Sequence, residues 1–302
     1  MTQILGIVKE GRLIPENLWI KFVSGLENNF DNLETNNERA KRELADAIAN
    51  AVRKRVAAKA GVLFSGGVDS SLIAFVLKKL NCNFTCYTVG IDGSDDIEWA
   101  QKVANEYKLS FKYKILNFDE LEIILRNVIK ILNDAEIVKV SVGSVLYAAG
   151  RLALADGNNV LFGGLGSEEI FAGYKRHEDA LQENNFEALH KECWDGLRNM
   201  WKRDLTRDFA IAKKLGLDLR TPFLDKDLIK IAMNVHPMLK LGKDNKKIIL
   251  REAAELIGLN KEFAWRKKQA AQYGSNFVNG IDKLARKNGF KFKKDYLQSL
   301  LK

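Results

Sequence analysis

Short apolar segments alternate with longer amphipathic ones along the first 175 residues of this 302-residue chain. Short apolar runs bounded by turn residues favour buried strands, and apolar positions at helical spacing favour amphipathic helices. Strands are predicted at residues 62–64, 84–89, 111–116 and 160–162. Helices are predicted at residues 38–60, 70–77, 95–107, 121–132 and 138–156. Such alternation is typical of an α/β fold with a doubly wound, mainly parallel sheet, whose ligands bind at the carboxyl ends of the strands.

The two ends of the chain show other patterns. Two short apolar runs near the start, at 4–8 and 12–14, predict a small hairpin, and a polar, asparagine-rich loop follows it. Beyond residue 175 the pattern is helical with no clear strand. We therefore expect three regions, which are an N-terminal hairpin and extension at 1–37, an α/β domain at 38–175, and a helical region at 176–302 that completes the ligand site.

The first predicted strand runs into the stretch V-L-F-S-G-G-V-D-S-S at residues 62–71. Two glycines end the strand and two serines open the helix. Backbone N–H groups and the helix dipole make such a helix N-terminus an anion site. Asp69 places a carboxylate where phosphate oxygens would lie, an arrangement that makes sense if Mg²⁺ stands between them. Further donors are the hydroxyls of Ser65, Ser70 and Ser71.

A second stretch of the same design follows the fourth predicted strand, with the sequence G-G-L-G-S-E-E-I-F-A-G-Y at residues 163–174. Glu168 and Glu169 lie in the first turn of a short predicted helix, where the helix dipole favours carboxylates. Simple capping also explains two acids at this position. If the two loops are neighbours at the sheet edge, however, Asp69 and Glu168 hold one Mg²⁺ against the same polyphosphate.

Composition narrows the class of protein. Hydrophobic residues make up 46% and charged residues 29% of the chain, as in soluble globular proteins. No apolar run approaches the roughly 20 residues of a membrane-spanning helix, and the first residues lack the basic segment of a secretory signal. We therefore expect a cytoplasmic protein without membrane contact. The cysteines have neither CxxC nor zinc spacing and are predicted to be small core residues: Cys82, Cys86 and Cys193.

The net charge of +9 is concentrated at the C-terminal end. Residues 261–302 carry 11 Lys/Arg against 3 Asp/Glu, whereas the rest of the chain carries 37 against 36. A basic tail of this kind is a solvated surface, a cover for a polyphosphate or a contact for nucleic acid.

The stretch at 62–71 is not a Walker loop, because G-x-x-x-x-G-K-[S/T] is absent. It resembles the S-G-G-x-D-S pyrophosphate loop of the N-type ATP pyrophosphatases, with all six positions matching at a strand–helix junction. A glycine-rich turn with a serine cap is the structural alternative. The resemblance implies a fold like that of the adenine-nucleotide α-hydrolases. It also implies an enzyme that cleaves ATP between the α and β phosphates, transfers AMP to a substrate and releases pyrophosphate.

Further segments, in order from about residue 40 to 275, resemble the synthetase domain of asparagine synthetases and β-lactam synthetases. Residues 163–174 are similar to that family's signature S-G-[E/D]-G-[A/S]-D-E-[L/V]-F-G-G-Y. The resemblance implies an ATP-dependent ligase that adenylates a small carboxylate, with aspartate as the family's example, and joins it to ammonia or an amine. The other matching segments are Ser94-Asp95-Asp96 with Trp99-Ala100, Asp204-Leu205 with Arg207, 220–225, 247–251 and 265–269.

The resemblance also implies a role for individual residues. Lys268, with Lys247 as a second cation, would stabilise the charge that grows on pyrophosphate as the α–β bond breaks. Such cations in a dry site are worth roughly 10²–10³ in rate each, by analogy with oxyanion donors. Asp69 and Glu168 would hold Mg²⁺, and Glu169 is a further catalytic candidate. ATP would be bound by Leu63, Ser65, Gly66, Gly67, Asp69, Ser70, Ser71, Val89, Gly163 and Gly164.

The chain departs from the family pattern at positions that concern amide formation and the nitrogen source. The family has an acidic residue, thought to serve in acid–base catalysis, at the position of Leu165 in this chain. Glu169 or a substrate group would have to take over that role. Glu168 stands where the family usually has aspartate. Asparagine synthetases carry a glutaminase whose nucleophile is a cysteine directly after Met1, whereas Thr2 follows Met1 here. Nitrogen would then come from free ammonia, from a separate glutaminase subunit or from another amine.

Three classes of function remain from the sequence. The first is the carboxylate-adenylating ligase. The second is an enzyme that modifies RNA, such as tRNA, because other members of the superfamily adenylate bases and the basic C-terminal end suits phosphates. The third is a non-catalytic nucleotide sensor, which Leu165 permits. Exchange of pyrophosphate into ATP, dependent on a carboxylate or on RNA, separates the three.

Overall fold

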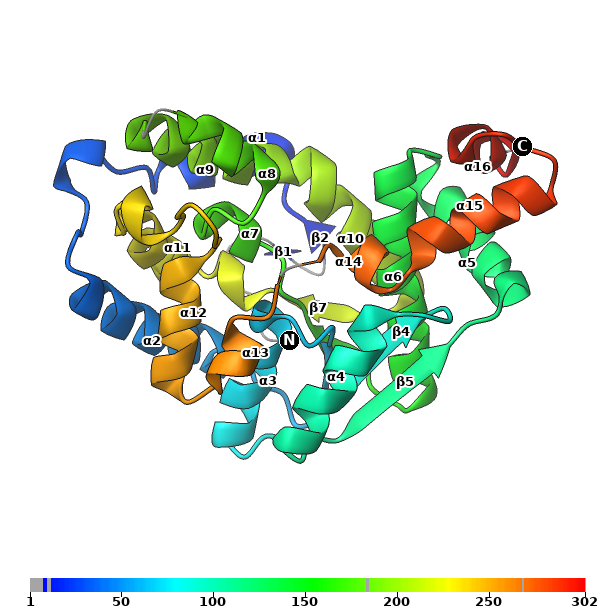
Figure 1. Cartoon of the computed structure of the whole chain (residues 1–302), viewed down its shortest axis with the longest axis horizontal. Helices are drawn as coiled ribbons and strands as arrows, with labels where there is room; N and C mark the ends of the chain where they lie inside the picture. Colours follow the sequence, from blue (N-terminus) through cyan, green and yellow to red (C-terminus); the bar gives the residue numbers. More distant parts are fainter. Residues whose placement is uncertain (1–7, 10–11, 183–184, 268, 302) are drawn as a thin grey trace.

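A five-stranded parallel sheet forms the centre of the computed structural model, which describes residues 8–9, 12–182, 185–267 and 269–301 (Figure 1). The strand order is β5-β4-β3-β6-β7, and each neighbouring pair is parallel. The predicted doubly wound, mainly parallel sheet is therefore confirmed. The strands are β3 (Ala60–Leu63), β4 (Phe84–Gly90), β5 (Phe111–Ile115), β6 (Val160–Phe162) and β7 (Asp218–Arg220).

The strand order reverses between β3 and β6. From β3 the chain adds β4 and then β5 on one side, and it later adds β6 and β7 on the other side. At such a switch point the connections leave in opposite directions, which opens a crevice at the carboxyl ends of the strands. Gly61 and Val62 of β3 pair with Leu161 and Phe162 of β6, so the two following loops start at the same level.

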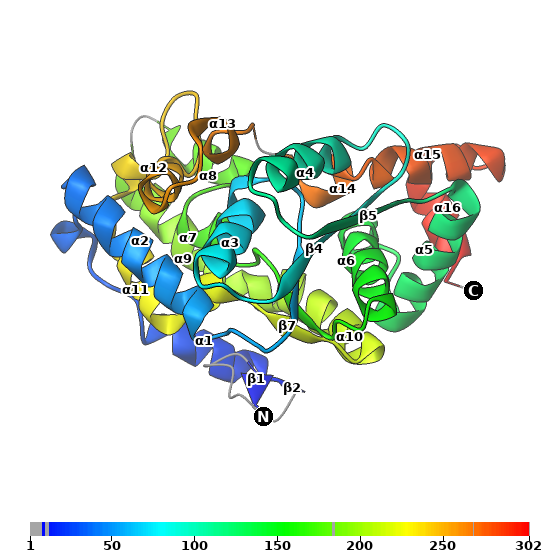
Figure 2. The ribbon, with the colours of Figure 1, turned by 90° about the horizontal axis from the view of Figure 1, so that it is seen from below.

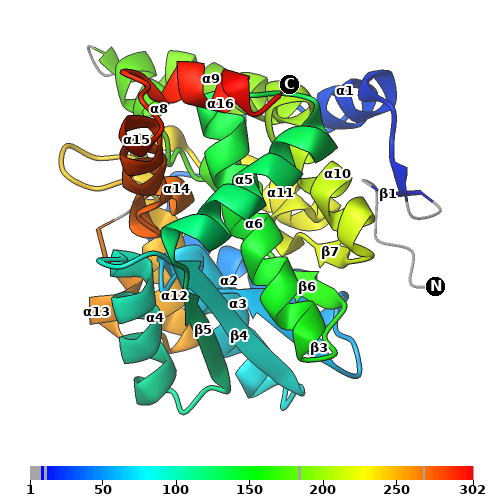
Figure 3. The same cartoon turned by 90° about the vertical axis from the view of Figure 1, so that its right-hand side faces the viewer.

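Helices cover both faces of the sheet (Figures 2 and 3). The helices on one face share a hydrophobic core with Val62 and Cys86 of the sheet, and those on the other share a core with Val89. The first layer contains α2 (Asn37–Arg53), α3 (Val68–Lys79), α4 (Asp95–Glu106), α12 (Ile248–Ile257) and α13 (Lys261–Ala264). The second contains α5 (Phe118–Leu132), α6 (Ile137–Ala155), α10 (Thr206–Leu215), α15 (Phe277–Lys287) and α16 (Lys293–Ser299).

The remaining elements connect these layers. In the N-terminal part, β1 (Val8–Lys9) and β2 (Arg12–Leu13) pair antiparallel, as the predicted hairpin requires, although 1–7 and 10–11 lie outside the described residues. The helix α1 (Glu16–Ser24) was not predicted; its buried Trp19 donates to the carbonyl of Leu197 at 2.9 Å.

The other helices are α7 (Ser167–Ile170), α8 (Lys175–Ala180), α9 (Phe186–Met200), α11 (Lys226–Asn234) and α14 (Ala271–Gly274). A π-helical turn, η3 (Trp201–Leu205), joins α9 to α10, and the 3₁₀ turns are η1 (Phe30–Asn32), η4 (Pro222–Leu224) and η5 (Pro237–Leu239).

Two predictions about the elements were wrong. The region beyond residue 175 contributes β7 to the sheet, a strand of three residues whose charged ends hide the β pattern. The predicted helix at 38–60 ends earlier, at Arg53, and Gly61 lies inside β3 rather than stopping a helix. A Cβ at Gly61 would come within 2.4 Å of Leu161 and 2.8 Å of Tyr87, so this glycine serves close packing within the sheet.

Within the part of the chain that the structure describes, α6 is long and apolar enough to cross a membrane by length and composition. About half of that stretch (56%) is buried inside the fold, where α6 packs against β3, β4, α5 and α10. Its apolar character therefore serves the core. The expectation that no apolar run approaches the length of a membrane-spanning helix was wrong for α6, which has 19 residues.

Candidate active site

The first loop, between β3 and α3, is held by its own hydrogen bonds. Ser70 Oγ donates to the carbonyl of Gly67 at 3.2 Å and accepts from the N–H of Ser65 at 3.3 Å. The N–H of Gly67 donates to Ser65 Oγ at 3.3 Å. These bonds order the loop before any ligand arrives, which favours binding of an anion by the N-terminus of α3.

Gly66 fixes the position of this loop on α4. Its φ is +69°, and a Cβ there would come within 2.7 Å of the backbone of Trp99 and Ala100. Only glycine combines a left-handed φ with so close an approach of two backbones.

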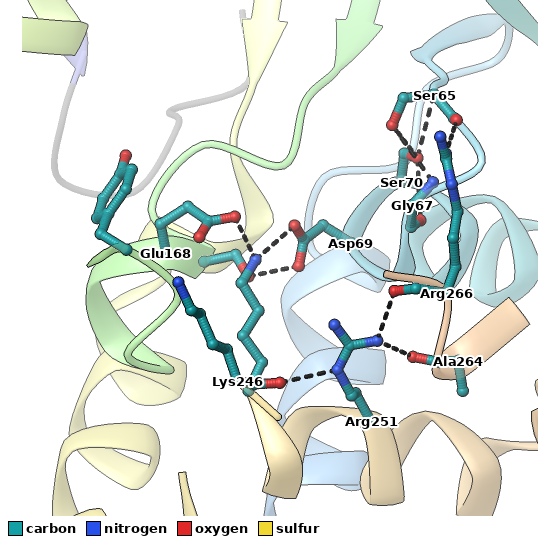
Figure 4. A network of polar contacts seen from close by, with 12 residues as sticks. Ser65, Gly67, Asp69, Ser70, Glu168, Lys246, Arg251, Ala264 and Arg266 are labelled. Carbon is teal, nitrogen blue, oxygen red and sulfur yellow. Dashed lines mark hydrogen bonds and ion pairs between the residues drawn. The ribbon is translucent and has the colours of Figure 1, made fainter. Parts of the chain in front are cut away.

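The second loop, between β6 and α7, touches the first. A Cβ at Gly164 would come within 3.0 Å of Asp69 Cβ, and one at Gly163 would lie 3.5 Å from Leu63 Cδ1. The carboxylates of Asp69 and Glu168 consequently face one another from the two loops (Figure 4).

A lysine from a distant part of the chain lies between these two carboxylates. Lys247 Nζ is 2.7 Å from Asp69 Oδ2 and 2.5 Å from Glu168 Oε1, and it donates to Ser167 Oγ at 3.2 Å. Ser167 Oγ in turn donates to Asp69 Oδ1 at 2.5 Å. We call these four residues the lysine cluster.

The backbone and the electrostatics of Lys247 are both unusual. It caps α12 with φ of +56°, a left-handed conformation that is costly for a side chain with a Cβ and that concentrates at functional sites. Burial alone would lower the pKa of Lys247, but Asp69 and Glu168 together raise that pKa above its usual value. The ammonium group therefore stays charged although the side chain is almost fully buried.

The donor set of the lysine cluster fits Mg²⁺ with a polyphosphate but not a protein-only metal cage. No group of three or more His, Cys, Asp or Glu side chains suited to a metal occurs among the described residues. Mg²⁺ is commonly held by one or two carboxylates, with phosphate oxygens and water completing the octahedron. Asp69 and Glu168 supply that number of carboxylates.

Glu169, next to Glu168 on α7, lies in a different environment. Its side chain is buried, and Oε1 accepts from Arg203 Nη2 at 2.5 Å and lies 3.7 Å from Arg176 Nη2. Oε2 is buried with no hydrogen-bond partner among the described residues. Burial, followed by the charge of Asp204, raises the pKa of Glu169 to about 7. We call Glu169, Arg176, Arg203 and Asp204 the arginine cluster.

A groove of about 1040 Å³ opens beside the two clusters. Its wall includes Gly173 and Tyr174, which lie between α7 and α8, and it extends to Trp265 and to Asn279 of α15. A smaller hollow of about 390 Å³ lies between α2 and Asp227 and includes no residue of either loop. The larger groove is the one next to the site, because its wall includes Lys246, adjacent to Lys247, and Tyr174, which contacts Arg176 and Arg203.

Comparison with known proteins shows the family of the chain. Residues 43–189 and 182–290 match the sequence model described as asparagine synthase. The chain belongs to the asparagine synthase family.

Relatives in the asparagine synthase family are similar over about half of their length. The chain is 34% identical over 295 residues to a putative glutamine-hydrolyzing asparagine synthetase 1 of Methanocaldococcus jannaschii, covering 86% of this chain and 54% of that protein. It is 30% identical over 257 residues to asparagine synthetase B of Escherichia coli, covering 78% and 45%. Among solved structures, NMN synthetase from Francisella tularensis is similar with a TM-score of 0.42 and 10% identity, over 88% of this chain and 94% of that one.

In the structure, most of the predicted ATP-binding residues lie along the first loop, the start of α3 and the strand ends. Leu63 is half-buried at the end of β3, and Val89 is buried in β4. Ser71 is buried, and its hydroxyl has no partner among the described residues. Lys268, predicted as a catalytic cation, lies outside the described residues.

Two cations of this asparagine synthase-family chain were missed from the sequence. Arg176 and Arg203 lie 4.0 and 5.2 Å from the ring centre of Tyr174 and also contact Glu169. Arg203 lies in the π-helical turn η3 together with Asp204, which Arg207 also contacts at 3.2 Å. The only sequence sign was the run of charges around the Asp204-Leu205 segment.

Proposed function

We propose that this chain acts as an ATP-dependent carbon–nitrogen ligase, which adenylates a carboxylate, releases pyrophosphate and transfers the acyl group to ammonia or an amine. The observation that carries the proposal is the lysine cluster at the switch point of the sheet, where a buried cation and two carboxylates meet beside an ordered anion-binding loop. Membership in the asparagine synthase family supports it, and aspartate is the first acceptor to test.

In the first step, a carboxylate oxygen of the acceptor attacks the α-phosphorus of ATP, and the bond from that phosphorus to the α–β bridging oxygen breaks. Backbone N–H groups of the first loop and the hydroxyls of Ser65 and Ser70 bind the departing pyrophosphate. Lys247 Nζ supplies positive charge where negative charge grows on the leaving group. Mg²⁺ held by Asp69 and Glu168 would neutralise and orient the polyphosphate.

In the second step, the amine nitrogen attacks the acyl carbon, and AMP leaves with the electrons of the acyl–oxygen bond. The nitrogen must lose a proton as the amide forms. Glu169 Oε2 suits this task, because it lacks a hydrogen-bond partner among the described residues and the pKa of Glu169 is about 7, near neutral pH. Leu165, which is half-buried in the second loop, contributes no ionisable group.

The test is exchange of labelled pyrophosphate into ATP across a panel of carboxylates, followed by amide formation with ammonium. We expect exchange only with the true acceptor, and loss of exchange in Asp69→Asn. Asp46→Asn, an exposed aspartate on α2, is the matched control and should exchange like wild type. Absence of exchange with every carboxylate and with RNA would contradict catalysis and favour a nucleotide sensor.

The RNA-modifying alternative depends on the basic C-terminal end. Part of that charge is already neutralised, since Arg286 and Lys293 lie 2.9 and 3.5 Å from Asp282, and Lys287 lies 3.6 Å from Asp119. Exchange that requires tRNA rather than a free carboxylate would replace our proposal with this alternative. Ammonium and glutamine compared as nitrogen sources would show whether a separate glutaminase subunit is needed.

A further inference from the structure

Two segments that the proposed chemistry does not use meet behind the first loop. Arg266, from the segment before α14, donates through Nη1 to the carbonyl oxygen of Ser65 (Figure 4). Through Nη2 it donates to Asp96 Oδ1 on α4 at 3.0 Å. Both charged side chains are buried, with 7% and 4% of their surface exposed. Burying an ion pair costs desolvation free energy unless its geometry is good, so stability alone does not explain this pair.

The Asp96 end of the pair is fixed by its surroundings. Ser94 caps α4 by accepting from the N–H of Ile97 at 3.3 Å, and its hydroxyl donates to the carbonyl of Gly274 at 2.9 Å. The carboxylate of Asp96 lies directly over Gly274, where a Cβ would come within 2.3 Å of Asp96 Cγ. The ring of Trp99, on the same helix, lies 5.3 Å from the guanidinium of Arg266.

The Arg266 end is joined, through Arg251, to the backbone beside the lysine cluster. Arg251 of α12 donates through Nη1 to the carbonyls of Ala264 and Arg266, at 2.6 and 3.0 Å. Its Nε donates to the carbonyl of Lys246 at 2.8 Å, immediately before Lys247. A continuous set of buried charged groups thus joins α4, the first loop and the backbone beside Lys247.

The contact with Ser65 controls a peptide unit that could otherwise turn over. A trans peptide is planar, so when the Ser65 carbonyl points toward Arg266, the N–H of Gly66 points the opposite way. Gly66 adopts both positive and negative φ readily, so its own conformational preference does not hold this peptide in one orientation. A flipped peptide would present a carbonyl oxygen, which repels phosphate, in place of an N–H donor.

We propose that Arg266 and Asp96 are positioning residues, which lock the Ser65–Gly66 peptide with its N–H toward the polyphosphate. The inference rests on the proposed function, because it assumes that the first loop binds the phosphates of ATP. Neither residue touches the nucleotide; each acts through the peptide. The expected consequence is a selective loss of affinity for pyrophosphate, with affinity for AMP largely kept.

The experiment is calorimetric titration of the full chain with magnesium pyrophosphate and, separately, with AMP. Loss of a charge-assisted hydrogen bond predicts about 10- to 100-fold weaker pyrophosphate binding in Arg266→Met. Asp96→Asn keeps the shape and removes the charge, so we expect a loss of about 3- to 10-fold. Because both residues act on one peptide, the double variant should bind pyrophosphate no more weakly than Arg266→Met alone.

Asp225→Asn is the matched control. Asp225 forms an equally buried ion pair with Arg55, at 2.8 Å, but that pair does not contact the first loop. This variant should lower the melting temperature as Asp96→Asn does and leave the dissociation constant of pyrophosphate unchanged.

The outcomes separate the two proposals. If wild type binds neither magnesium pyrophosphate nor ATP, the proposed function fails. If wild type binds pyrophosphate and folded Asp96→Asn and Arg266→Met bind it equally well, the positioning role is overturned. Equal losses for pyrophosphate and AMP would also overturn it, because they would show a general loss of structure.

Discussion

Two adjacent residues on α7 enter two very different electrostatic environments. In the lysine cluster, Asp69 and Glu168 share the ammonium of Lys247 and keep 23% and 17% of their side chains exposed. In the arginine cluster, only 1% of the Glu169 side chain is exposed, and one carboxylate oxygen lacks a hydrogen-bond partner among the described residues. One cluster therefore pairs a buried cation with two carboxylates, and in the other burial raises the pKa of Glu169 to about 7.

This difference matches the two steps of the proposed reaction. Breaking the α–β bond of ATP needs charge that does not change during the step, which the raised pKa of Lys247 provides. Forming an amide needs a group that accepts a proton, which the raised pKa of Glu169 provides. We therefore expect variants of the two clusters to affect different steps.

The largest effect is expected for Glu169→Gln on amide formation. Loss of a general base costs about 10²–10⁴ in rate, so amide formation should fall by that amount while pyrophosphate exchange changes little. The two rates are measured on the same preparation, with Glu168→Gln as the neighbouring control, which should lower exchange instead. An equal fall of both rates in Glu169→Gln would break the division between the clusters.

Lys247→Met should reduce pyrophosphate exchange by about 10²–10³, because a preplaced cation is lost from a dry site. Lys243→Met, an exposed lysine four residues earlier, is the control and should leave exchange unchanged. A second measurement is binding of Mn²⁺ without nucleotide, followed by electron paramagnetic resonance. Lys247→Met should bind Mn²⁺ more tightly than wild type, because Asp69 and Glu168 then face each other without a cation. Unchanged Mn²⁺ affinity would contradict the role of these two carboxylates as metal ligands.

The sequence led to the lysine cluster only in part. The first loop could be predicted because its strand, glycines, serines and aspartate are consecutive, and local rules apply to consecutive residues. Lys247 was predicted as a second cation near the phosphates, but its place between two carboxylates depends on the packing of α12 against the sheet layer. No spacing in the sequence encodes such a long-range contact.

The arginine cluster was largely beyond prediction. Arg203, which contacts Glu169, lies with Asp204 in the π-helical turn η3, and one extra residue in a helical turn leaves no clear trace in a hydrophobic pattern. The same holds for β7, whose three residues form a strand only because β6 offers them an edge. The sequence motifs around Asp96 and Arg266 were visible, but their contact with one another was not.

The pH dependence of stability is a further test of the arginine cluster. The pKa of Glu169 in the folded protein is about 7, above its usual value of 4.5, so the folded state binds this proton more tightly than the unfolded state does. Its contribution to stability is thus fully present below about pH 4.5 and is lost as the pH rises through 7. Relative to Glu169→Gln, wild type should lose about 3 kcal/mol of unfolding free energy between pH 4.5 and 8. Urea titrations at several pH values measure it, and a constant difference between the two proteins would show that folding does not raise the pKa of Glu169.

The smallest effect is expected at Leu165, where the family places an acid. Leu165 packs half-buried against the main hydrophobic core, so a carboxylate introduced there keeps some contact with water and should not prevent folding. In the wild-type background, Leu165→Glu should change amide formation little, because Glu169 already accepts the proton. In the Glu169→Gln background the same substitution should restore about tenfold, which is less than the roughly 10²–10⁴ of a well-placed general base, because the new carboxylate is not held by arginines. Leu165→Gln, which has the same size without the charge, should restore nothing. If Leu165→Glu alone raised amide formation strongly, the proton would leave through the position of Leu165, and the arginine cluster would lose its assigned role.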